Sequence, residues 1–389
     1  MKGYLAYRLL RARAARAVHE TLGRAAAFAG RSVLGFGGAS GEPERILGVS
    51  LQRIGDAVAT EPALRMLAER FPGARIEVAA AASRERGPAM GAVEVFAMMP
   101  QVKAVHAVRG WRDLRALAGE NDLVLTFGLR ARDAWAALVA RGSRGVAIGY
   151  SWGGRGAALD RELAPPDQIM LTAEEARARR ARPQHELWAD LLWRARLVDD
   201  DEATRRVEPP RLVPGEAAAR DALALLRERD LGDFVAIAPW NDQPHYRWPE
   251  ERWVVLVKKL GRPAVIVGGH SPEECAHAHR IAVASGAISF AGLLSLDRAA
   301  ALLARARVVV AVDSGPAHVA RAVSAPTVVV FGPGSPLVWG PPGAKIVQRS
   351  EGCHGCRQPR CYQERRVCLE ELTVESVVSL AEGLLDVRV

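Results

Sequence analysis

LQRIGDAVATEPALRML (residues 51–67) and VDSGPAHVARAVSAPTVVVFGP (residues 312–333) decide the fold of this chain. Each segment is typical of a strand, a tight glycine turn and a helix, and each carries an aspartate at the carboxyl end of its strand. In open α/β sheets ligands bind at that edge, because strand ends and helix N-termini converge there. The two segments stand in opposite halves of the chain, which predicts two lobes whose aspartate-bearing edges face a central cleft.

The rest of the chain alternates short β-rich runs with helical stretches, the pattern of parallel sheets covered by helices. In the first half we expect strands at 46–52, 75–81, 103–108, 122–128 and 145–150, and helices at 59–71, 111–119 and 131–142. In the second half we expect strands at 233–240, 263–269, 287–292, 307–315 and 326–332, and helices at 216–229, 249–260, 271–285, 295–306 and 316–324. The pattern predicts an α/β protein with two Rossmann-like, doubly wound parallel-sheet domains. Residues 151–182 have weak periodicity and receive no assignment.

The charged, proline-containing stretch 199–215 lacks an apolar period and marks the boundary between the lobes. The predicted units are a basic extension and linker (1–44), a first Rossmann-like domain (45–205), a second Rossmann-like domain that includes the cysteine-rich segment 353–368 (206–372) and a terminal helix (373–389). We expect that helix to cross back to the first lobe.

The basic charge gathers at the N-terminus, because residues 1–31 supply +6 of the formal net charge of +9. Apolar residues among these arginines suit a helix on an anionic membrane surface, although a solvated helix or a frayed tail has the same composition. The hydrophobic content of 49% supports well-packed cores. No apolar run reaches the roughly 18 residues of a membrane span, so we expect a cytoplasmic protein, with residues 1–31 as its candidate contact with a membrane surface.

Gly55 and Asp56 lie where the first strand meets its helix. Glycine permits a tight turn there, and a helix N-terminus favours an ionised carboxylate, which is the state that a general base requires. The alternative is that Asp56 caps the helix.

The second lobe has matching features at its own sheet edge. Asp313, Ser314 and Gly315 form a turn before Pro316, and His318 follows one helical turn later. Free backbone N–H groups at such a turn suit a diphosphate, and the alternative is a purely structural turn. The loop after the strand at 233–240 adds further polar and aromatic groups, chiefly Trp240, Asn241 and Arg247. Arg247 suits phosphate charge, or else forms a surface salt bridge.

Four of the five cysteines lie close together, as Cys353, Cys356, Cys361 and Cys368. Four thiolates suit a structural Zn²⁺ or iron ion, and a cytoplasmic location disfavours disulfides. Disulfides and free thiols remain the alternatives. Cys275 falls on a predicted helix and is expected to be an ordinary buried thiol.

Together these segments resemble glycosyltransferase family 9, the lipopolysaccharide heptosyltransferases. The resemblance rests on RIGD (53–56), RWPEERW (247–253), VIVGG (265–269), DSGPAHVA (313–320) and WGP (339–341), and it covers roughly residues 45–385. It implies a GT-B fold and metal-independent, inverting transfer. The implied partners are an ADP-heptose donor, held mainly by the second lobe, and a lipid-linked saccharide acceptor. No feature of the sequence suggests a nucleic acid as partner.

The resemblance also implies roles for single residues. Asp56 matches the proposed general base, and Asp313, Ser314, Gly315 and His318 match the loop that holds the donor. Glu274 resembles the ribose-binding carboxylate, with Glu273 as the alternative, and Leu294 falls where the family packs adenine. Many members have lysine where this chain has Tyr246, so the adjacent Arg247 is the candidate replacement. The alternatives are another nucleotide sugar, a protein or other glycan acceptor, and a non-catalytic nucleotide-sugar-binding protein.

Overall fold

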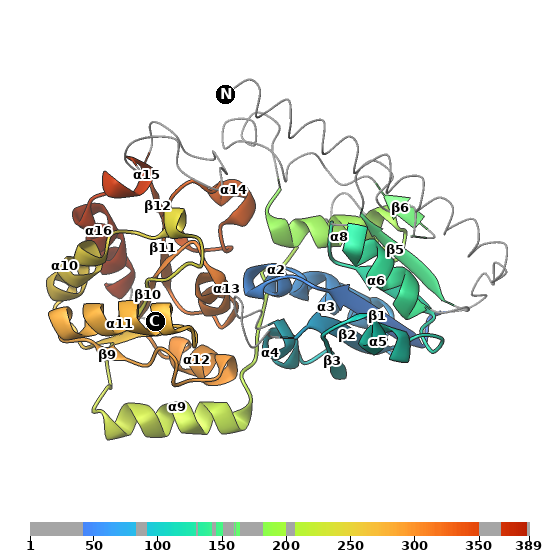
Figure 1. The fold of residues 1–389 in the computed structure, drawn as a ribbon, viewed down its shortest axis with the longest axis horizontal. Coiled ribbons are helices and arrows are strands. Elements are labelled where there is room, and N and C mark those ends of the chain that lie inside the picture. Colours follow the sequence, from blue (N-terminus) through green and yellow to red (C-terminus); the bar gives the residue numbers. More distant parts are fainter. Residues whose placement is uncertain are drawn as a thin grey trace.

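The computed structural model describes residues 42–82, 92–129, 131–141, 145–150, 159, 161–163, 182–199, 207–349 and 367–386. They form two α/β lobes side by side (Figure 1). The two-domain prediction is confirmed. The predicted extension 1–44 lies outside these residues except for its last three positions, and so do Cys353, Cys356 and Cys361.

The first lobe contains a parallel sheet of six strands. Their spatial order is β3 (Ala104–Val108), β2 (Arg75–Ala81), β1 (Arg45–Ser50), β4 (Leu123–Thr126), β5 (Val146–Tyr150) and β6 (Arg161–Leu163). The helices are α2 (Ile54–Ala59), α3 (Glu61–Arg70), α4 (Ala92–Ala97), α5 (Trp111–Ala116), α6 (Ala131–Arg141) and α8 (Gln184–Arg194). Five strands agree with the expected runs. The sequence did not predict β6, α4 or α8.

Alternate residues of β1 point to opposite faces of this sheet, as the two-residue period requires. Ile46 packs in one hydrophobic cluster with α2, α3, α4 and α8, whereas Leu47 packs in another with α5 and α6. The expected helix at 59–71 is in fact preceded by a separate helix, α2. Pro62 at the start of α3 cannot donate a backbone hydrogen bond, which separates the two helices at Thr60.

The second lobe repeats this architecture. Its parallel strands lie in the order β12 (Lys345–Gln348), β11 (Thr327–Phe331), β10 (Val308–Val312), β7 (Val235–Ala238), β8 (Ala264–Ile266) and β9 (Ile288–Ser289). The helices are α9 (Glu216–Glu228), the 3₁₀ helix η2 (Pro244–Tyr246), α10 (Glu250–Leu260), α11 (Pro272–Ser285), α12 (Leu296–Leu303), α13 (Gly315–Ala322), α14 (Pro336–Trp339), α15 (Val367–Glu370) and α16 (Val374–Leu385). Among these elements, β12, η2, α14 and α15 lack a counterpart in the predicted list.

Both sheets have the strand order of a doubly wound Rossmann fold, with the order reversing between β1 and β4 and between β7 and β10. The strand VVVAV of β10 is buried at every position, because helices cover both faces of a parallel sheet. Ligands of such folds bind outside the carboxyl ends of the strands at the reversal. The topology therefore places one candidate crevice in each lobe, and these crevices are on the sides of the lobes that meet.

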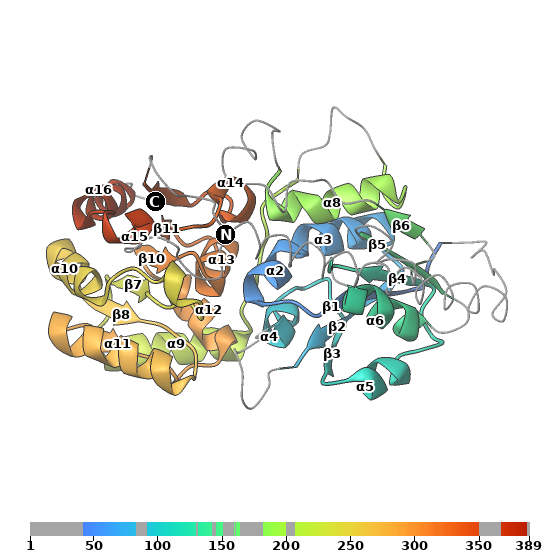
Figure 2. The ribbon, with the colours of Figure 1, turned by 45° about the horizontal axis from the view of Figure 1, so that its top comes forward.

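The terminal helix α16 packs on the second lobe, against α10, β10, β11 and β12 (Figure 2). This corrects the expectation that it crosses back to the first lobe. Val377 and Ala381 are fully buried in the same hydrophobic cluster as Val308 and Val310 of β10. The second lobe thus supplies the apolar surface that this helix needs.

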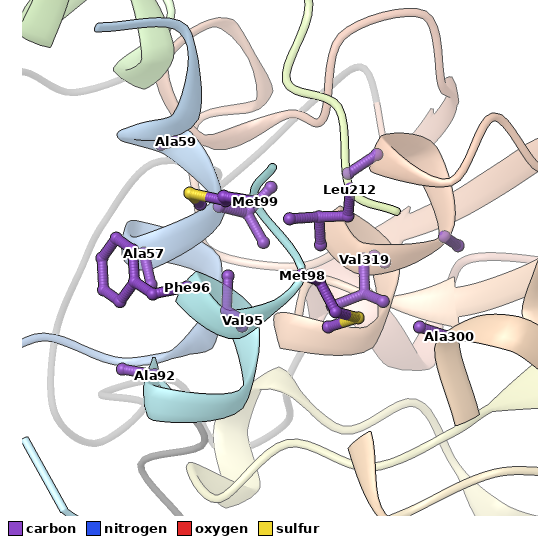
Figure 3. Packing of buried hydrophobic residues seen from close by; sticks show 14 of the residues in the cluster. Ala57, Ala59, Ala92, Val95, Phe96, Met98, Met99, Leu212, Ala300 and Val319 are labelled. Atoms are coloured by element: carbon purple, nitrogen blue, oxygen red, sulfur yellow. The ribbon is translucent and has the colours of Figure 1, made fainter. Parts of the chain in front are cut away.

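The two lobes share an apolar contact. Met98, which follows α4, lies close to Val319 of α13 and to Leu212 of the connecting segment 207–215 (Figure 3). The backbone of that segment bonds to both lobes: Val213 N–H donates to Met98 O at 2.9 Å, and Leu212 N–H donates to Ala322 O at 2.9 Å. Buried contact on both sides fixes how the carboxyl edges of the two sheets face each other.

Candidate active site between the lobes

The first-lobe edge of the site is the start of α2. Asp56 is the third residue of this helix and is partly buried. The N-cap position belongs to Arg53, whose side chain makes no capping hydrogen bond. Asp56 is therefore not the N-cap residue, and its role as a base or as a carboxylate that stabilises the helix start stays a prediction. Its carboxylate lies in the first turn, where the helix dipole favours a negative charge.

The starts of α2 and α13 pack directly against each other across the lobe interface. A Cβ atom on Gly55 would lie 3.0 Å from Cδ2 of His318, and one on Gly315 would lie 2.8 Å from Cβ of Ile54. Only glycine fits at the second of these positions without a shift of the neighbouring backbone. The two glycines thus let the helix that carries Asp56 approach the helix that follows Asp313.

The second-lobe edge is built across the reversal of strand order. Asn241 follows β7 and donates from Nδ2 to the carbonyl oxygen of Asp313, after β10, at 2.5 Å. Ser314 occupies the N-cap position of α13, but its hydroxyl donates to Val312 O at 3.0 Å and does not cap the helix. The backbone N–H groups at this helix start are therefore not capped by that side chain and suit an anion.

Arg247 lies beside this edge in a defined position. Its guanidinium carbon is 3.3 Å from the ring centroid of Trp240, its Nε donates to Asn241 O at 2.6 Å, and its Nη1 donates to Glu273 Oε1 at 2.8 Å. Tyr246, which occupies the position of the family lysine, instead stacks on His245 with ring centroids 4.8 Å apart. Arg247 is thus the cation that this loop brings to the strand ends.

Glu274 lies in the first turn of α11, and its side chain reaches back to Gly268 and Gly269, which follow strand β8. Its carboxylate oxygens pack so closely on Gly268 and Gly269 that added Cβ atoms would come within 2.9 and 2.8 Å of them. Burial raises the pKa of Glu274 above its ordinary value, and the charge of Asp242 acts in the same direction. Its neighbour Glu273 is exposed and pairs with Arg247. The two carboxylates therefore have different environments and different roles.

His318 is an uncharged imidazole at neutral pH. Burial, and to a smaller extent the nearby His185, lower the pKa of His318 to about 4. His185, on α8 of the first lobe, is itself buried, and burial lowers its pKa to about 4. His318 can therefore exchange a hydrogen bond with a ligand but does not supply positive charge. The sequence analysis missed His185 because it lies on α8, a helix that was not predicted, and belongs to no recognisable motif.

The structure brings together most of the predicted site residues at one place. Trp240, Asn241, Arg247, Glu274, Asp313 and Ser314 lie at the carboxyl ends of β7, β8 and β10, and Gly315 and His318 contact α2 at Ile54 and Gly55. A further residue that was not predicted as a site residue, Asp242, pairs with Arg53 of the first lobe at 3.8 Å. This ion pair connects the two lobes beside the site.

Two further predictions, Leu294 and the cysteine cluster, are not tested by this arrangement. Leu294 is 7% exposed and packs in the hydrophobic core, whereas its neighbour Leu293 is 67% exposed. Of the four clustered cysteines, only Cys368 lies among the described residues, and it is buried in the core of the second lobe. Within the described ranges, no group of three or more metal-ligating side chains is found.

Comparison with known proteins identifies the family of the chain. Residues 126–366 match the family model described as glycosyltransferase family 9 (heptosyltransferase). The chain is 29% identical over 126 residues to lipopolysaccharide heptosyltransferase 1 of Escherichia coli O18:K1:H7, covering 32% of this chain and 39% of that protein. It is 26% identical over 298 residues to lipopolysaccharide heptosyltransferase 2 of Escherichia coli K12, covering 74% and 72%. The chain thus spans less than half the length of the first of these relatives.

Solved structures share the fold. A family 9 glycosyl transferase from Veillonella parvula superposes with a TM-score of 0.72 at 19% identity, covering 88% of this chain and 97% of that one. Escherichia coli heptosyltransferase WaaC with ADP gives 0.64 at 20% identity, covering 87% and 99%. The iron-containing glycosyltransferase TibC of enterotoxigenic Escherichia coli gives 0.51 at 16% identity, covering 88% and 76%. These neighbours have the GT-B architecture, so the fold prediction is confirmed.

Proposed function

The chain belongs to glycosyltransferase family 9, the heptosyltransferase family, and we propose that it transfers a heptose from ADP-heptose to a lipid A-linked lipopolysaccharide core acceptor. The curated relatives are lipopolysaccharide heptosyltransferases, and a structural neighbour is described with ADP. One observation carries the proposal: α2 packs on α13, which brings the helix of Asp56 next to the turn at Asp313 that we expect to bind a diphosphate.

The donor would be held by the second lobe. The uncapped start of α13 offers backbone N–H groups to the diphosphate, and Arg247 offers a fixed cation beside them. His318 is neutral at physiological pH, so the charge of the diphosphate must be met by these other groups. Glu274, in the first turn of α11, packs on the glycines after β8, and this place is suited to accept hydrogen bonds from ribose hydroxyls.

The reaction would be a single displacement with inversion at the anomeric carbon. The carboxylate of Asp56 takes the proton of the acceptor hydroxyl while that oxygen bonds to the anomeric carbon of the donor. The bond from the anomeric carbon to the diphosphate oxygen breaks, and its electron pair leaves with ADP. General-base action typically contributes about 10²–10⁴-fold to a rate, and one preorganised hydrogen-bond donor about 10²–10³-fold.

No metal ion takes part in this proposed reaction, because Arg247 and the start of α13 stabilise the charge of the leaving group. A structural zinc or iron ion at Cys353, Cys356, Cys361 and Cys368 stays a prediction, since three of these residues lie outside the described ranges. Tetrahedral thiolate coordination would fit either ion.

We also propose that the basic N-terminal residues place the enzyme on the cytoplasmic face of the inner membrane, where its lipid-linked acceptor is exposed. Among the helices that the structure describes, none has the length and apolarity of a membrane span. Attachment would therefore rest on residues 1–31 and their +6 charge. Co-sedimentation with anionic liposomes should decrease when residues 1–40 are removed; equal binding with and without them would contradict the attachment.

Removal of the proposed base tests the central step. Asp56→Asn and Asp56→Ala should lower the turnover of ADP-heptose by at least about 10²-fold, because no other group then accepts the proton. Calorimetry should show ADP affinity close to that of the parent protein. The matched control is Asp199→Asn, which changes an exposed carboxylate of the first lobe. Turnover near the parent level in Asp56→Asn would show that another group is the base.

The identity of the donor is tested separately by titration with ADP-heptose, UDP-glucose and GDP-mannose. We expect heat of binding with ADP-heptose alone at micromolar concentration. A preference for either of the other two nucleotide sugars would reassign the donor while leaving the two-lobed site in place.

A further inference from the structure

Three attachments of the Arg247 guanidinium differ in character. The first is the ring of Trp240, which is 8% exposed, and the second is the backbone carbonyl of Asn241. The third is the carboxylate of Glu273, whose side chain is 72% exposed. Two of the three attachments therefore belong to the packed body of the second lobe, and one belongs to a solvated side chain.

The ring of Trp240 is itself held in place by contacts with neighbouring side chains. The ring of His277 lies 5.3 Å from the ring of Trp240, and its Nδ1 is 3.1 Å from Glu250 Oε2. Arg280 binds the same carboxylate of Glu250 at 2.7 Å. This row of contacts runs from α10 and α11 to the loop after β7, so the tryptophan ring under Arg247 is held in one position.

Exposed ion pairs contribute little to stability, because water solvates both partners and side-chain entropy opposes them. The pairing of Arg247 with Glu273 is exposed on the Glu273 side only, so the carboxylate can leave while the guanidinium stays on Trp240. A diphosphate carries more charge than a carboxylate and accepts two parallel hydrogen bonds from a guanidinium. It is therefore the stronger ligand for the same cation.

We propose that Glu273 is an exchangeable counter-ion of Arg247, which the diphosphate of the nucleotide displaces while Trp240 and the Asn241 carbonyl keep the guanidinium at the site. The exchange rests on the proposed function for its natural ligand, a nucleoside diphosphate sugar. It assigns to Glu273 a role distinct from that of Glu274. Glu273 competes with every bound diphosphate, so it weakens the binding of the product ADP and speeds its release.

The test measures binding of ADP and of inorganic pyrophosphate to the full chain and its variants by calorimetry and stopped flow. Glu273→Gln keeps the shape of the side chain and removes its charge, and we expect both ligands to bind about two- to five-fold more tightly, mainly through slower dissociation. Glu251→Gln is the matched control, because Glu251 is an exposed carboxylate in the first turn of the adjacent helix α10. It should change neither affinity.

A double-mutant cycle decides whether Glu273 acts through Arg247. Arg247→Ala should weaken both ligands by at least ten-fold, and adding Glu273→Gln to it should have no further effect. If Glu273→Gln raised the affinity equally with and without Arg247, Glu273 would act only by general charge repulsion of the ligand. That result would overturn the exchange. Weaker ADP binding in Glu273→Gln, with pyrophosphate unchanged, would assign Glu273 to the ribose and also overturn it.

The two ligands separate this inference from the proposed function. Pyrophosphate binding that follows the predicted pattern, together with no ADP binding to any variant, would contradict the nucleotide site and retain the exchange. ADP binding to the parent protein that Glu273→Gln leaves unchanged would retain the nucleotide site and overturn the exchange. Thermal unfolding of each variant checks that the fold is intact.

Discussion

Gly315→Ala tests the contact between the lobes with a single methyl group. The new Cβ would lie 2.8 Å from Cβ and 2.9 Å from Cγ2 of Ile54. Carbon atoms in favourable contact are about 3.5–4.0 Å apart, so α13 and α2 must separate by about 1 Å. The backbone of Gly315 does not have a positive φ angle, so the effect comes from this contact and not from backbone strain.

A displacement of about 1 Å at a reacting centre can lower a rate by about 10²-fold. We therefore expect kcat for heptose transfer to fall by about that factor, because Asp56 and the donor site lie on the two helices that separate. ADP affinity should change only a few-fold, since the donor site stays within the second lobe. Stability should decrease by about 1–3 kcal/mol, as is typical of overpacking.

The control is Gly383→Ala in α16, where an added Cβ meets no atom within 4 Å. Alanine is favoured over glycine in a helix by about 1 kcal/mol, so this variant should be fully active and at least as stable as the parent. The assay is ADP release at saturating donor and acceptor, alongside calorimetry. Turnover of Gly315→Ala within two-fold of the parent value would refute the claim that the α2–α13 contact sets the reacting geometry.

Three further predictions concern the connecting segment 207–215, the pH dependence of stability and the metal content of the cysteine cluster. Glu61 is 1% exposed and accepts hydrogen bonds from Arg65 Nε (3.0 Å) and from the backbone N–H of Arg211 in the connecting segment (3.0 Å). Glu61→Ala should therefore lower the free energy of unfolding in urea by about 3 kcal/mol and speed proteolysis of residues 207–215. The control Glu216→Ala, at an exposed carboxylate, should change neither quantity. The pKa values of His185 and His318 in the folded protein are about 4, so the unfolded chain binds more protons than the folded chain between about pH 6.5 and 4. The free energy of unfolding should therefore fall by up to about 3 kcal/mol per histidine as the pH decreases through that window. His185→Gln should reduce this fall, and a pH profile that the substitution leaves unchanged would contradict the assignment. Elemental analysis of protein purified without a metal-affinity tag should find about one zinc or iron per chain, lost in Cys353→Ser; a metal-free parent protein would exclude the predicted site.

The fold was largely predictable because the signals for it are local. The buried runs of β10 and β11 are long and β-branched, and helices such as α11 have a serine cap, proline in the first turn and a terminal glycine. Strand β6 was missed because it lies in the stretch 151–182, where the periodicity is weak, and β12 was missed because only two of its four residues are apolar. The terminal helix α16 was misplaced because an amphipathic pattern shows that a helix has a buried face but not which lobe covers it.

The candidate site was predictable mainly where its residues stand in turns and loops that directly follow predicted strands. Asp56, Asp313 and Gly315 were found in this way, and the structure places them at facing edges. The pairing of Arg247 with Glu273 depends on tertiary contact between loops after different strands, which no spacing reveals. The same holds for His185, whose neighbour His318 belongs to the other lobe.

Leu294 remains a prediction that rests on the resemblance alone. Its side chain is 7% exposed and that of its neighbour Leu293 is 67% exposed. Whether a side chain at this position meets a ligand depends on tertiary contacts that the sequence pattern does not show.

The position of ADP-heptose in a crystal structure of the complex tests the central claim most directly. We predict the diphosphate at the start of α13, within hydrogen-bond distance of Arg247 and of the Gly315 backbone, with the anomeric carbon facing the Asp56 carboxylate across the lobe interface. Donor bound away from β7, β8 and β10, or an Asp56 side chain directed away from the anomeric carbon, would contradict the account.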